Sequence, residues 1–159
     1  MQYQRAYLES FGYTLPKEIV STDELEQRLA PVYERLRLPH GRLELMTGIQ
    51  TRRFFPPHTS PSSKSILSGE KAIQASGIDR KHIGALVHGS VCRDFLEPAT
   101  ACGVHHGLKL SSDCLIHDAS NACLGLLSGL IQVANMIELG QIRAGLVVGT
   151  ECGRQLVEN

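Results

Sequence analysis

The sequence predicts an α/β fold with a largely parallel sheet. From residue 63 onward the signals alternate in the order helix, strand, helix, strand, helix, strand. Such alternation builds parallel sheets through right-handed crossovers. The segments 84–90 and 144–150 are apolar almost throughout, as is typical of strands buried on both faces. The length of 159 residues allows one domain with a hydrophobic core. We therefore expect a sheet covered by helices on both faces.

The first sixty residues carry less regular signals. Residues 3–13 predict a strand or a pair of short strands. Ser21 is followed three residues later by Glu24, which is the capping-box spacing of a helix start, and this helix is expected to stop before Pro31. The remaining expectations are an irregular helical stretch at 33–46, a turn at Gly48, an extended segment at 51–55 and a loop at 56–63.

The second part of the chain carries the alternating elements. Pro98 is expected to begin a helix, because proline suits the first turn. Residues 119–137 carry no charge and approach the length of a membrane span. Their five polar side chains favour a buried helix in a water-soluble domain instead. The expected elements are helices at 63–77, 98–107 and 121–139 and strands at 84–90, 113–118 and 144–150.

Composition narrows the classes of function. Sixteen basic and sixteen acidic residues cancel, so the basic patch typical of nucleic-acid binding is not expected. The N-terminus lacks the basic and apolar pattern of a secretory signal. Five cysteines form an odd set without a disulfide-like framework, which favours reduced thiols and a cytoplasmic location.

Cys123 is the main candidate for chemistry. It lies in the segment DASNACLG, where the strand at 113–118 turns into the long helix. The positive end of a helix dipole favours a thiolate, and free N–H groups there can bind an oxyanion. The alternative is a buried, inert cysteine. The other four cysteines lack such a setting: Cys92, Cys102, Cys114 and Cys152.

Glu97 is the second candidate, within the segment SVCRDFLEPATA. Taken alone, it is better explained as an acidic residue at a helix start, which the helix dipole favours. The adjacent pair His105 and His106 does not form a metal-binding motif, since adjacent helical residues point in different directions. CxxC, HExxH and phosphate-loop patterns are absent from the sequence. We therefore expect no metal site.

The block DASNACLGLLSGLIQVANMIELGQIRAGLVVGTE resembles the nucleophile segment of β-ketoacyl-acyl-carrier-protein synthase III. Thr47-Gly48-Ile49 and the later Arg52-Arg53 agree with that family. The resemblance implies that residues 1–159 form a thiolase-like N-terminal domain in which Cys123 is acylated. It also implies a C-terminal half, carrying the family's catalytic histidine and asparagine, that is not present in this sequence. Acetyl-primed members carry Trp and Arg where this sequence has Arg42 and Met46, which speaks against acetyl-primed activity.

The segment SVCRDFLEPATA is most similar to the OleA-type branch, which condenses two long acyl chains. In that branch a glutamate in the matching position serves as base and reaches the active site of the partner subunit, which implies the same for Glu97. The implied function is a Claisen condensation of acyl-CoA or acyl carrier protein through an acyl-cysteine, in a homodimer, without metal or redox cofactor. The alternative is a non-catalytic dimerisation or scaffold module, or a fragment without turnover.

Overall fold

A computed structural model describes residues 2–154. The chain forms two compact units. The first contains residues 2–14 and 60–151, and the second contains residues 15–59 and 152–154. Each unit is described by itself below.

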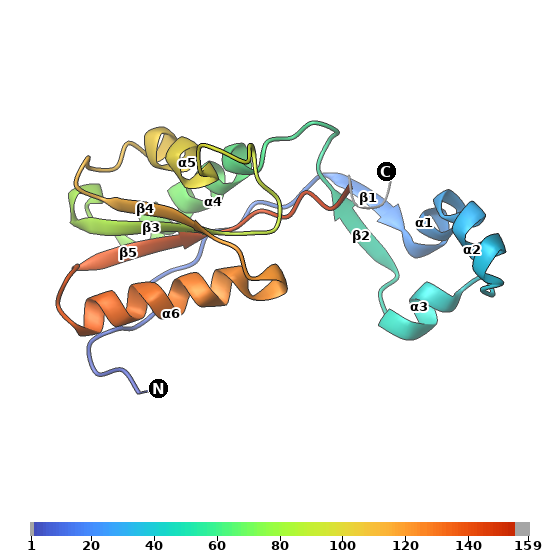
Figure 1. Ribbon diagram of the computed structural model, residues 1–159, viewed down its shortest axis with the longest axis horizontal. Coiled ribbons are helices and arrows are strands. Elements are labelled where there is room, and N and C mark those ends of the chain that lie inside the picture. The colour runs from blue at the N-terminus through green and yellow to red at the C-terminus, as the bar shows by residue number, and fades with distance from the viewer. Residues whose placement is uncertain (1, 155–159) are drawn as a thin grey trace. The chain divides into compact units, whose positions relative to one another are not determined.

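The first unit is built on a parallel three-stranded sheet (Figure 1). Strand β3 (Ile83–Gly89) lies in the centre, between β4 (Leu115–Ala119) and β5 (Ala144–Val148). Both pairings are parallel, and Gly89 at the end of β3 is opposite Ala119 at the end of β4. The predicted α/β class and parallel sheet are confirmed.

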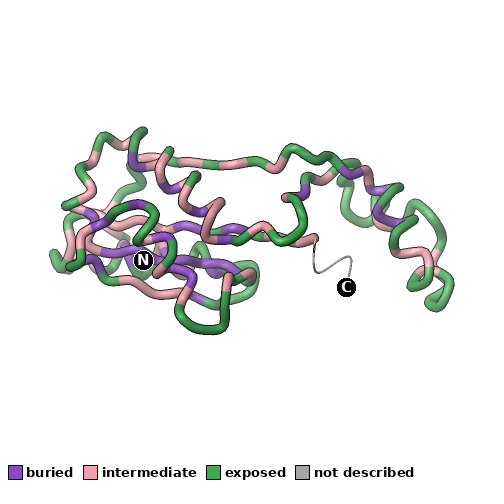
Figure 2. The backbone as a smooth tube through the Cα atoms, turned by 90° about the horizontal axis from the view of Figure 1, so that it is seen from above, coloured by how far each residue is buried: buried purple, intermediate pink, exposed green. Residues whose placement is uncertain are grey.

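Helices cover both faces of this sheet, as predicted. Helices α4 (Pro61–Ser76) and α5 (Thr100–Leu108) lie on one face, and α6 (Gly125–Glu138) lies on the other (Figure 1). Side chains of β3 alternate between the two layers. On the α4 and α5 side, Leu86 packs with the core residues of α5, and on the α6 side Val87 packs with those of α6. Figure 2 shows this buried strand at the centre of the unit.

Small residues let α6 lie directly on the sheet. A Cβ at Gly129 would be 2.8 Å from a methyl group of Val147 and 3.0 Å from one of Val87. Val133, one turn later, is 5% exposed and continues the contact. Because residues four apart lie on one face of a helix, Gly125, Gly129 and Val133 form the buried stripe.

The outer face of α6 differs from the sequence prediction. The uncharged run predicted a buried helix, but Leu126, Leu127 and Ile131 are 43%, 54% and 40% exposed. One stripe of the helix is enough to cover the three strands, so its apolar outer side faces away from this core.

Residues 3–13 do not form the predicted strands. The amides of Gln4 and Arg5 donate to the carboxylate of Glu138, at 3.1 and 2.9 Å. The hydroxyl of Ser10 donates to the carbonyl of Ala72 at 2.8 Å. The segment is thus held by a side chain of α6 and by α4, instead of by the backbone ladder that defines a strand.

Within residues 15–59, the second unit contains three short helices and an antiparallel strand pair. Strand β1 (Glu18–Ser21), which the sequence analysis missed, pairs with β2 (Thr51–Phe54). The hydroxyl of Ser21 accepts from the amide of Glu24 at 3.0 Å, which confirms the predicted cap. The helices are α1 (Thr22–Arg28), α2 (Ala30–Leu36) and α3 (Arg42–Thr47). The last ends at Gly48, whose φ of +66° confirms the predicted turn.

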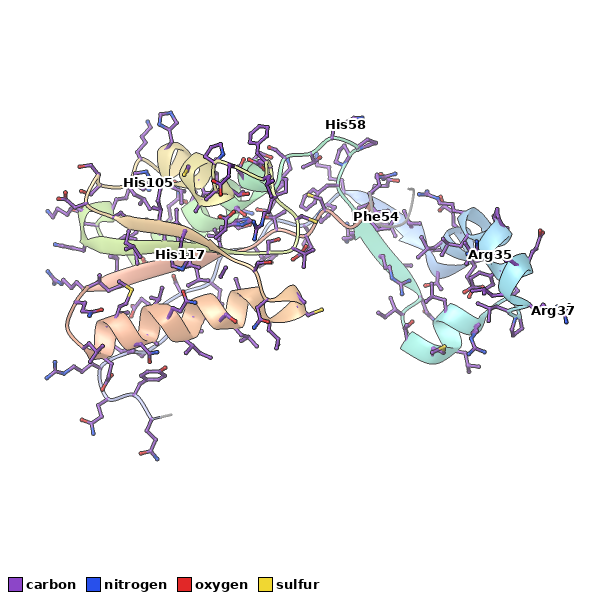
Figure 3. All side chains as sticks on the ribbon, in the orientation of Figure 1. Arg35, Arg37, Phe54, His58, His105 and His117 are labelled. Carbon is purple, nitrogen blue, oxygen red and sulfur yellow. The ribbon has the colours of Figure 1, made fainter. Side chains whose placement is uncertain are left out.

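A buried carboxylate joins the helices of this unit. Glu26 on α1 is 2% exposed. It accepts from the amides of Gly41 and Leu43, each at 2.6 Å, and from the hydroxyl of Tyr33 at 2.9 Å. Burial alone would raise the pKa of Glu26, but these donors outweigh it and lower the pKa. On β2, buried Phe54 (Figure 3) lies under the guanidinium of Arg154, 5.3 Å from the ring centre.

Candidate active site

Cys123 lies on a tight turn between β4 and α6. A single 3₁₀ turn, η2 (Ala122–Leu124), precedes the α-helix, so the predicted helix start at Asn121 is instead a separate turn. Ala122 has a φ of +43°, in the left-handed region that costs a non-glycine residue about 1–2 kcal/mol. Cys123 itself is exposed. Strained backbone of this kind concentrates at functional sites, and here it immediately precedes the thiol.

Two glycines seat this turn on the end of the sheet. A Cβ at Gly89 would lie 2.5 Å from the carbonyl carbon and oxygen of Gly125. A Cβ at Gly125 would lie 3.0 Å from the carbonyl oxygen of Ala119. The backbone at the start of α6 therefore touches the backbone at the end of β3. The amino end of α6 and the carboxyl ends of the strands meet next to Cys123, where parallel α/β sheets build their sites.

Glu97 lies in a loop that follows the neighbouring strand. The loop covers residues 90–99 between β3 and α5, and Glu97 is exposed. Both candidate segments leave the same edge of the sheet, since the ends of β3 and β4 are in register. They continue to opposite faces, one to α5 and one to α6. Within residues 2–154, no hydrogen bond or ion pair joins Glu97 to Cys123.

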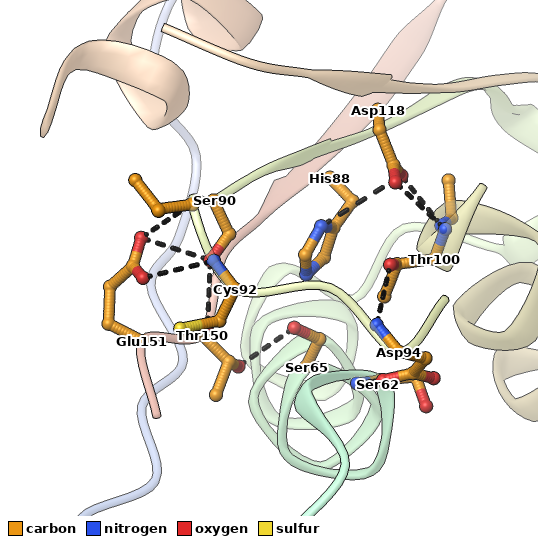
Figure 4. Close-up of polar contacts among 12 residues, drawn as sticks. Ser62, Ser65, His88, Ser90, Cys92, Asp94, Thr100, Asp118, Thr150 and Glu151 are labelled. Atoms are coloured by element: carbon orange, nitrogen blue, oxygen red, sulfur yellow. Dashed lines mark hydrogen bonds and ion pairs between the residues drawn. The ribbon is translucent and has the colours of Figure 1, made fainter. Parts of the chain in front are cut away.

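Asp118 caps α5. Its carboxylate accepts from the amides of Thr100 and Ala101, each at 2.8 Å (Figure 4). The side chain is 7% exposed. A carboxylate at a helix N-terminus satisfies free N–H groups and complements the dipole. Helix α5 therefore begins at Thr100, two residues after the predicted start at Pro98.

Two further carboxylates hold the loop that carries Glu97. Glu151, after β5, accepts from the amides of Val91 and Cys92 at 2.9 and 3.3 Å. Burial alone would raise the pKa of Glu151, but these hydrogen bonds outweigh it and lower the pKa. Asp94 accepts from the amide of Ser62 at the start of α4, at 3.0 Å. These contacts are drawn together in Figure 4.

His88 lies beneath this polar cluster. Its ring is fully buried, and the Nδ1 atom is 3.9 Å from a carboxylate oxygen of Asp118. Neither ring nitrogen has a hydrogen-bond partner within the described residues. Burial lowers the pKa of His88 and outweighs the opposing attraction of Asp118, Asp94 and Glu151. The imidazole is therefore neutral at neutral pH.

No pattern in the sequence predicted that one cluster would form from His88, Asp94, Asp118 and Glu151. A partial signal was available, because His88, Asp118 and Glu151 all stand at or just after the carboxyl end of a predicted strand. The ends of parallel strands meet at one edge, so polar residues there tend to gather.

Three other cysteine and histidine side chains are accounted for by burial or by a hydrogen bond. Cys114 is buried, and burial raises the pKa of its thiol. His105 on α5 contacts the carbonyl of Ser111 at 2.9 Å, and His117 on β4 contacts Gln132 of α6 at 2.7 Å (Figure 3). Among residues 2–154, no three His, Cys, Asp or Glu side chains are grouped as a metal site requires. No helix in this range is long and apolar enough to cross a bilayer.

A hollow of about 450 Å³ lies elsewhere in the first unit. Its lining includes Tyr7 of the N-terminal segment, together with His82 and Arg143, which directly precede β3 and β5. Cys123 and Glu97 follow the carboxyl ends of the strands. The hollow is therefore separate from both candidate residues.

Comparison with known proteins identifies relatives over nearly the whole chain. No protein-family model matches. The acyl-CoA:acyl-CoA alkyltransferase of Shewanella oneidensis is 48% identical over 99% of this chain and 45% of its own length. The acyl-CoA:acyl-CoA alkyltransferase of Xanthomonas campestris pv. campestris is 32% identical over 99% of this chain and 47% of its own length. The chain thus spans about half the length of the curated relatives that it matches.

Solved structures agree with the sequence relatives. Cerulenin-bound Xanthomonas OleA matches with a TM-score of 0.90 and 32% identity, over 99% of this chain and 48% of that one. A cysteine-to-serine variant of Xanthomonas campestris OleA with bound lauric acid and lauroyl-CoA matches with a TM-score of 0.87 and 31% identity, over 96% of this chain and 45% of that one. The resemblance drawn from the nucleophile block and from SVCRDFLEPATA is confirmed. By sequence and by fold, this chain corresponds to the N-terminal half of the OleA-type, thiolase-fold acyl-CoA:acyl-CoA alkyltransferases.

Proposed function

We propose that this chain supplies the nucleophile of an enzyme that condenses two acyl-CoA molecules. The observation that carries the proposal is the exposed Cys123 on a strained turn at the start of α6. The Cys123 thiolate attacks the carbonyl carbon of an acyl thioester, the bond to the CoA sulfur breaks, and CoA leaves as a thiolate that takes up a proton. Backbone N–H groups of the turn stabilise the oxyanion that forms in this attack.

Glu97 is proposed as the base of the second step. It removes an α-proton from a second acyl-CoA, and the resulting carbanion attacks the acyl-Cys123 carbonyl. The bond to the Cys123 sulfur then breaks and a 3-oxoacyl-CoA is released, after which Glu97 loses its proton to solvent. One comparison supports this role. The cysteine and the glutamate substituted in the solved Xanthomonas OleA variants stand 26 positions apart, as do Cys123 and Glu97.

The active enzyme is proposed to be a homodimer. Strand β4 is an edge strand of the sheet, with Leu115 51% exposed. An open edge with apolar side chains is suited to pairing with another strand. Within residues 2–154, no hydrogen bond or ion pair joins Glu97 to Cys123, which agrees with Glu97 serving the active site of the partner subunit. Acyl-CoA is the proposed substrate because the curated relatives are named for it. The chemistry itself calls for no metal or redox cofactor, because a thioester is already activated.

Acylation by a long-chain acyl-CoA tests the proposed function. The protein, assembled with a counterpart of the second half of its relatives, is incubated with lauroyl-CoA and digested, and the acyl adduct is located by mass spectrometry. We expect the adduct on Cys123, its loss in Cys123→Ala, and its retention in the matched control Cys102→Ala. An adduct on another cysteine contradicts the assignment. A protein that forms no adduct and still dimerises would instead be a non-catalytic dimerisation module.

A further inference from the structure

The loop that carries Glu97 has no regular secondary structure, yet its first residues are firmly anchored. Residues 90–99 contain no helix or strand. Glu151 accepts from Val91 and Cys92, and also from the hydroxyl of Ser90 at 3.0 Å. Hydrogen bonds to a charged acceptor are roughly twice as strong as neutral ones. One side chain therefore fixes three consecutive residues where the loop leaves β3.

Glu151 reaches this loop from a different strand. It stands three residues after the end of β5, and Ser90 shares its single hydroxyl proton between Glu151 and the carbonyl of Thr150, which lies at 2.6 Å. Thr150 is in turn 2.8 Å, hydroxyl to hydroxyl, from the buried Ser65 of α4. Glu151 and the start of the loop are thus connected to the core by hydrogen bonds, so β5 and α4 determine the position of the loop.

We propose that Glu151 is a positioning residue that places Glu97 for proton abstraction. The proposal rests on the proposed function, in which Glu97 is the base. Glu151 itself is not a candidate for that base. Burial alone would raise its pKa, but its donors outweigh burial and hold the pKa low, whereas a general base works best with a pKa near the operating pH.

Removal of Glu151 is expected to loosen the loop and to leave the fold intact. Ser90 keeps its bond to Thr150. Val91 is exposed, so water can reach its amide once the carboxylate is gone. The two other carboxylates differ in this respect, because Asp118 and Asp94 contact the first turns of α5 and α4. Glu151 is therefore the anchor whose loss tests positioning separately from folding.

The experiment compares Glu151→Ala, Glu151→Gln and the matched control Glu9→Gln in the assembled enzyme. Amide hydrogen exchange is measured over residues 91–97, and acylation of Cys123 and condensation are followed separately. For Glu151→Ala we expect exchange over 91–97 to rise by about tenfold. Condensation kcat should fall by roughly ten- to a hundredfold, since a shift of about 1 Å in a catalytic group has such an effect. KM and the acylation rate should stay within about twofold, as expected if only proton abstraction is misplaced.

The conservative variant separates positioning from other roles. Glu151→Gln keeps one acceptor oxygen and should recover part of the condensation rate. Unchanged exchange over 91–97, or an equal loss of acylation and condensation, overturns the proposal.

The outcome for Glu97→Gln shows which proposal fails. If Glu97→Gln condenses at the wild-type rate, the assignment of Glu97 as the base in the proposed function is wrong. The positioning role of Glu151 is then wrong as well, even if the exchange data confirm that Glu151 holds the loop. If Glu97→Gln is impaired while Glu151→Ala condenses normally, the base assignment stands and the positioning role alone is wrong.

Discussion

Gly89 and Gly125 touch backbone to backbone at the base of the Cys123 turn. A Cβ on Gly89 would lie 2.5 Å from the carbonyl carbon and oxygen of Gly125 and 2.6 Å from the amide nitrogen of Leu126. The opposing atoms are main-chain atoms, which cannot rotate away as a side chain can. The end of the central strand and the start of α6 are therefore in contact only because both positions lack a side chain.

The first prediction concerns this contact. Gly89→Ala should lower the free energy of unfolding by about 1–3 kcal/mol, the usual cost of overpacking a core, and should slow acylation of Cys123 by displacing its turn. Gly103→Ala in α5 is the control, because its new Cβ would be 3.5 Å from the nearest atom and alanine favours a helix. Chemical denaturation and the acylation assay measure both effects. Equal stability of the two variants would contradict the contact.

The second prediction concerns thiol reactivity. With a substoichiometric amount of iodoacetamide, Cys123 should be alkylated at least about tenfold faster than Cys114, because the thiolate is the reactive form. Cys123 is exposed, whereas Cys114 is buried and burial raises its pKa. Peptide mass spectrometry of the folded protein measures the ratio. The difference should vanish in denaturant, and preferential labelling of Cys114 in the folded protein would refute the assignment.

The third prediction concerns pH and His88. Burial lowers the pKa of His88 in the folded protein, whereas an unfolded histidine has a pKa of about 6.5. Below about pH 6.5 the unfolded chain therefore binds a proton that the folded chain does not, and stability falls as the pH decreases. The slope approaches about 1.4 kcal/mol per pH unit from this one group.

The variant His88→Gln isolates that slope. Its unfolding free energy should depend less on pH between about 6.5 and 5 than that of the wild type. The carboxyl group of Glu151 has a lowered pKa and contributes at lower pH than His88 does. Its stabilisation is lost only as the pH falls below the usual carboxyl range. Identical pH dependence of both proteins would show that His88 takes up its proton equally in the folded and unfolded states.

The fourth prediction concerns the proposed division of labour between subunits. In Glu97→Gln, Cys123 should still be acylated, while condensation falls by roughly a hundredfold or more through loss of general base catalysis. Mixing Glu97→Gln subunits with Cys123→Ala subunits should restore part of the activity, because one site of each mixed dimer then holds both wild-type groups. Full activity of a monomer would contradict the shared site.

Local patterns in the sequence were sufficient for the framework of the first unit. The apolar runs of β3 and β5 and the long helical period of α6 are properties of consecutive residues, so they predict elements without knowledge of what packs against them. The cap at Ser21 and the turn at Gly48 are equally local. The strand-to-helix position of Cys123 follows from the same signals.

Tertiary structure alone decided the features that depend on distant residues. The start of α5 is set by Asp118, 18 residues away, and the Glu97 loop is held by Glu151, about 60 residues away. Residues 3–13 have a strand-like sequence, but their hydrogen bonds go to α4 and to Glu138, so no strand forms. A hydrogen bond between segments far apart leaves no periodic trace in either segment. The sequence therefore determined where Cys123, the proposed nucleophile, stands, and only the folded chain determined how its surroundings are held in place.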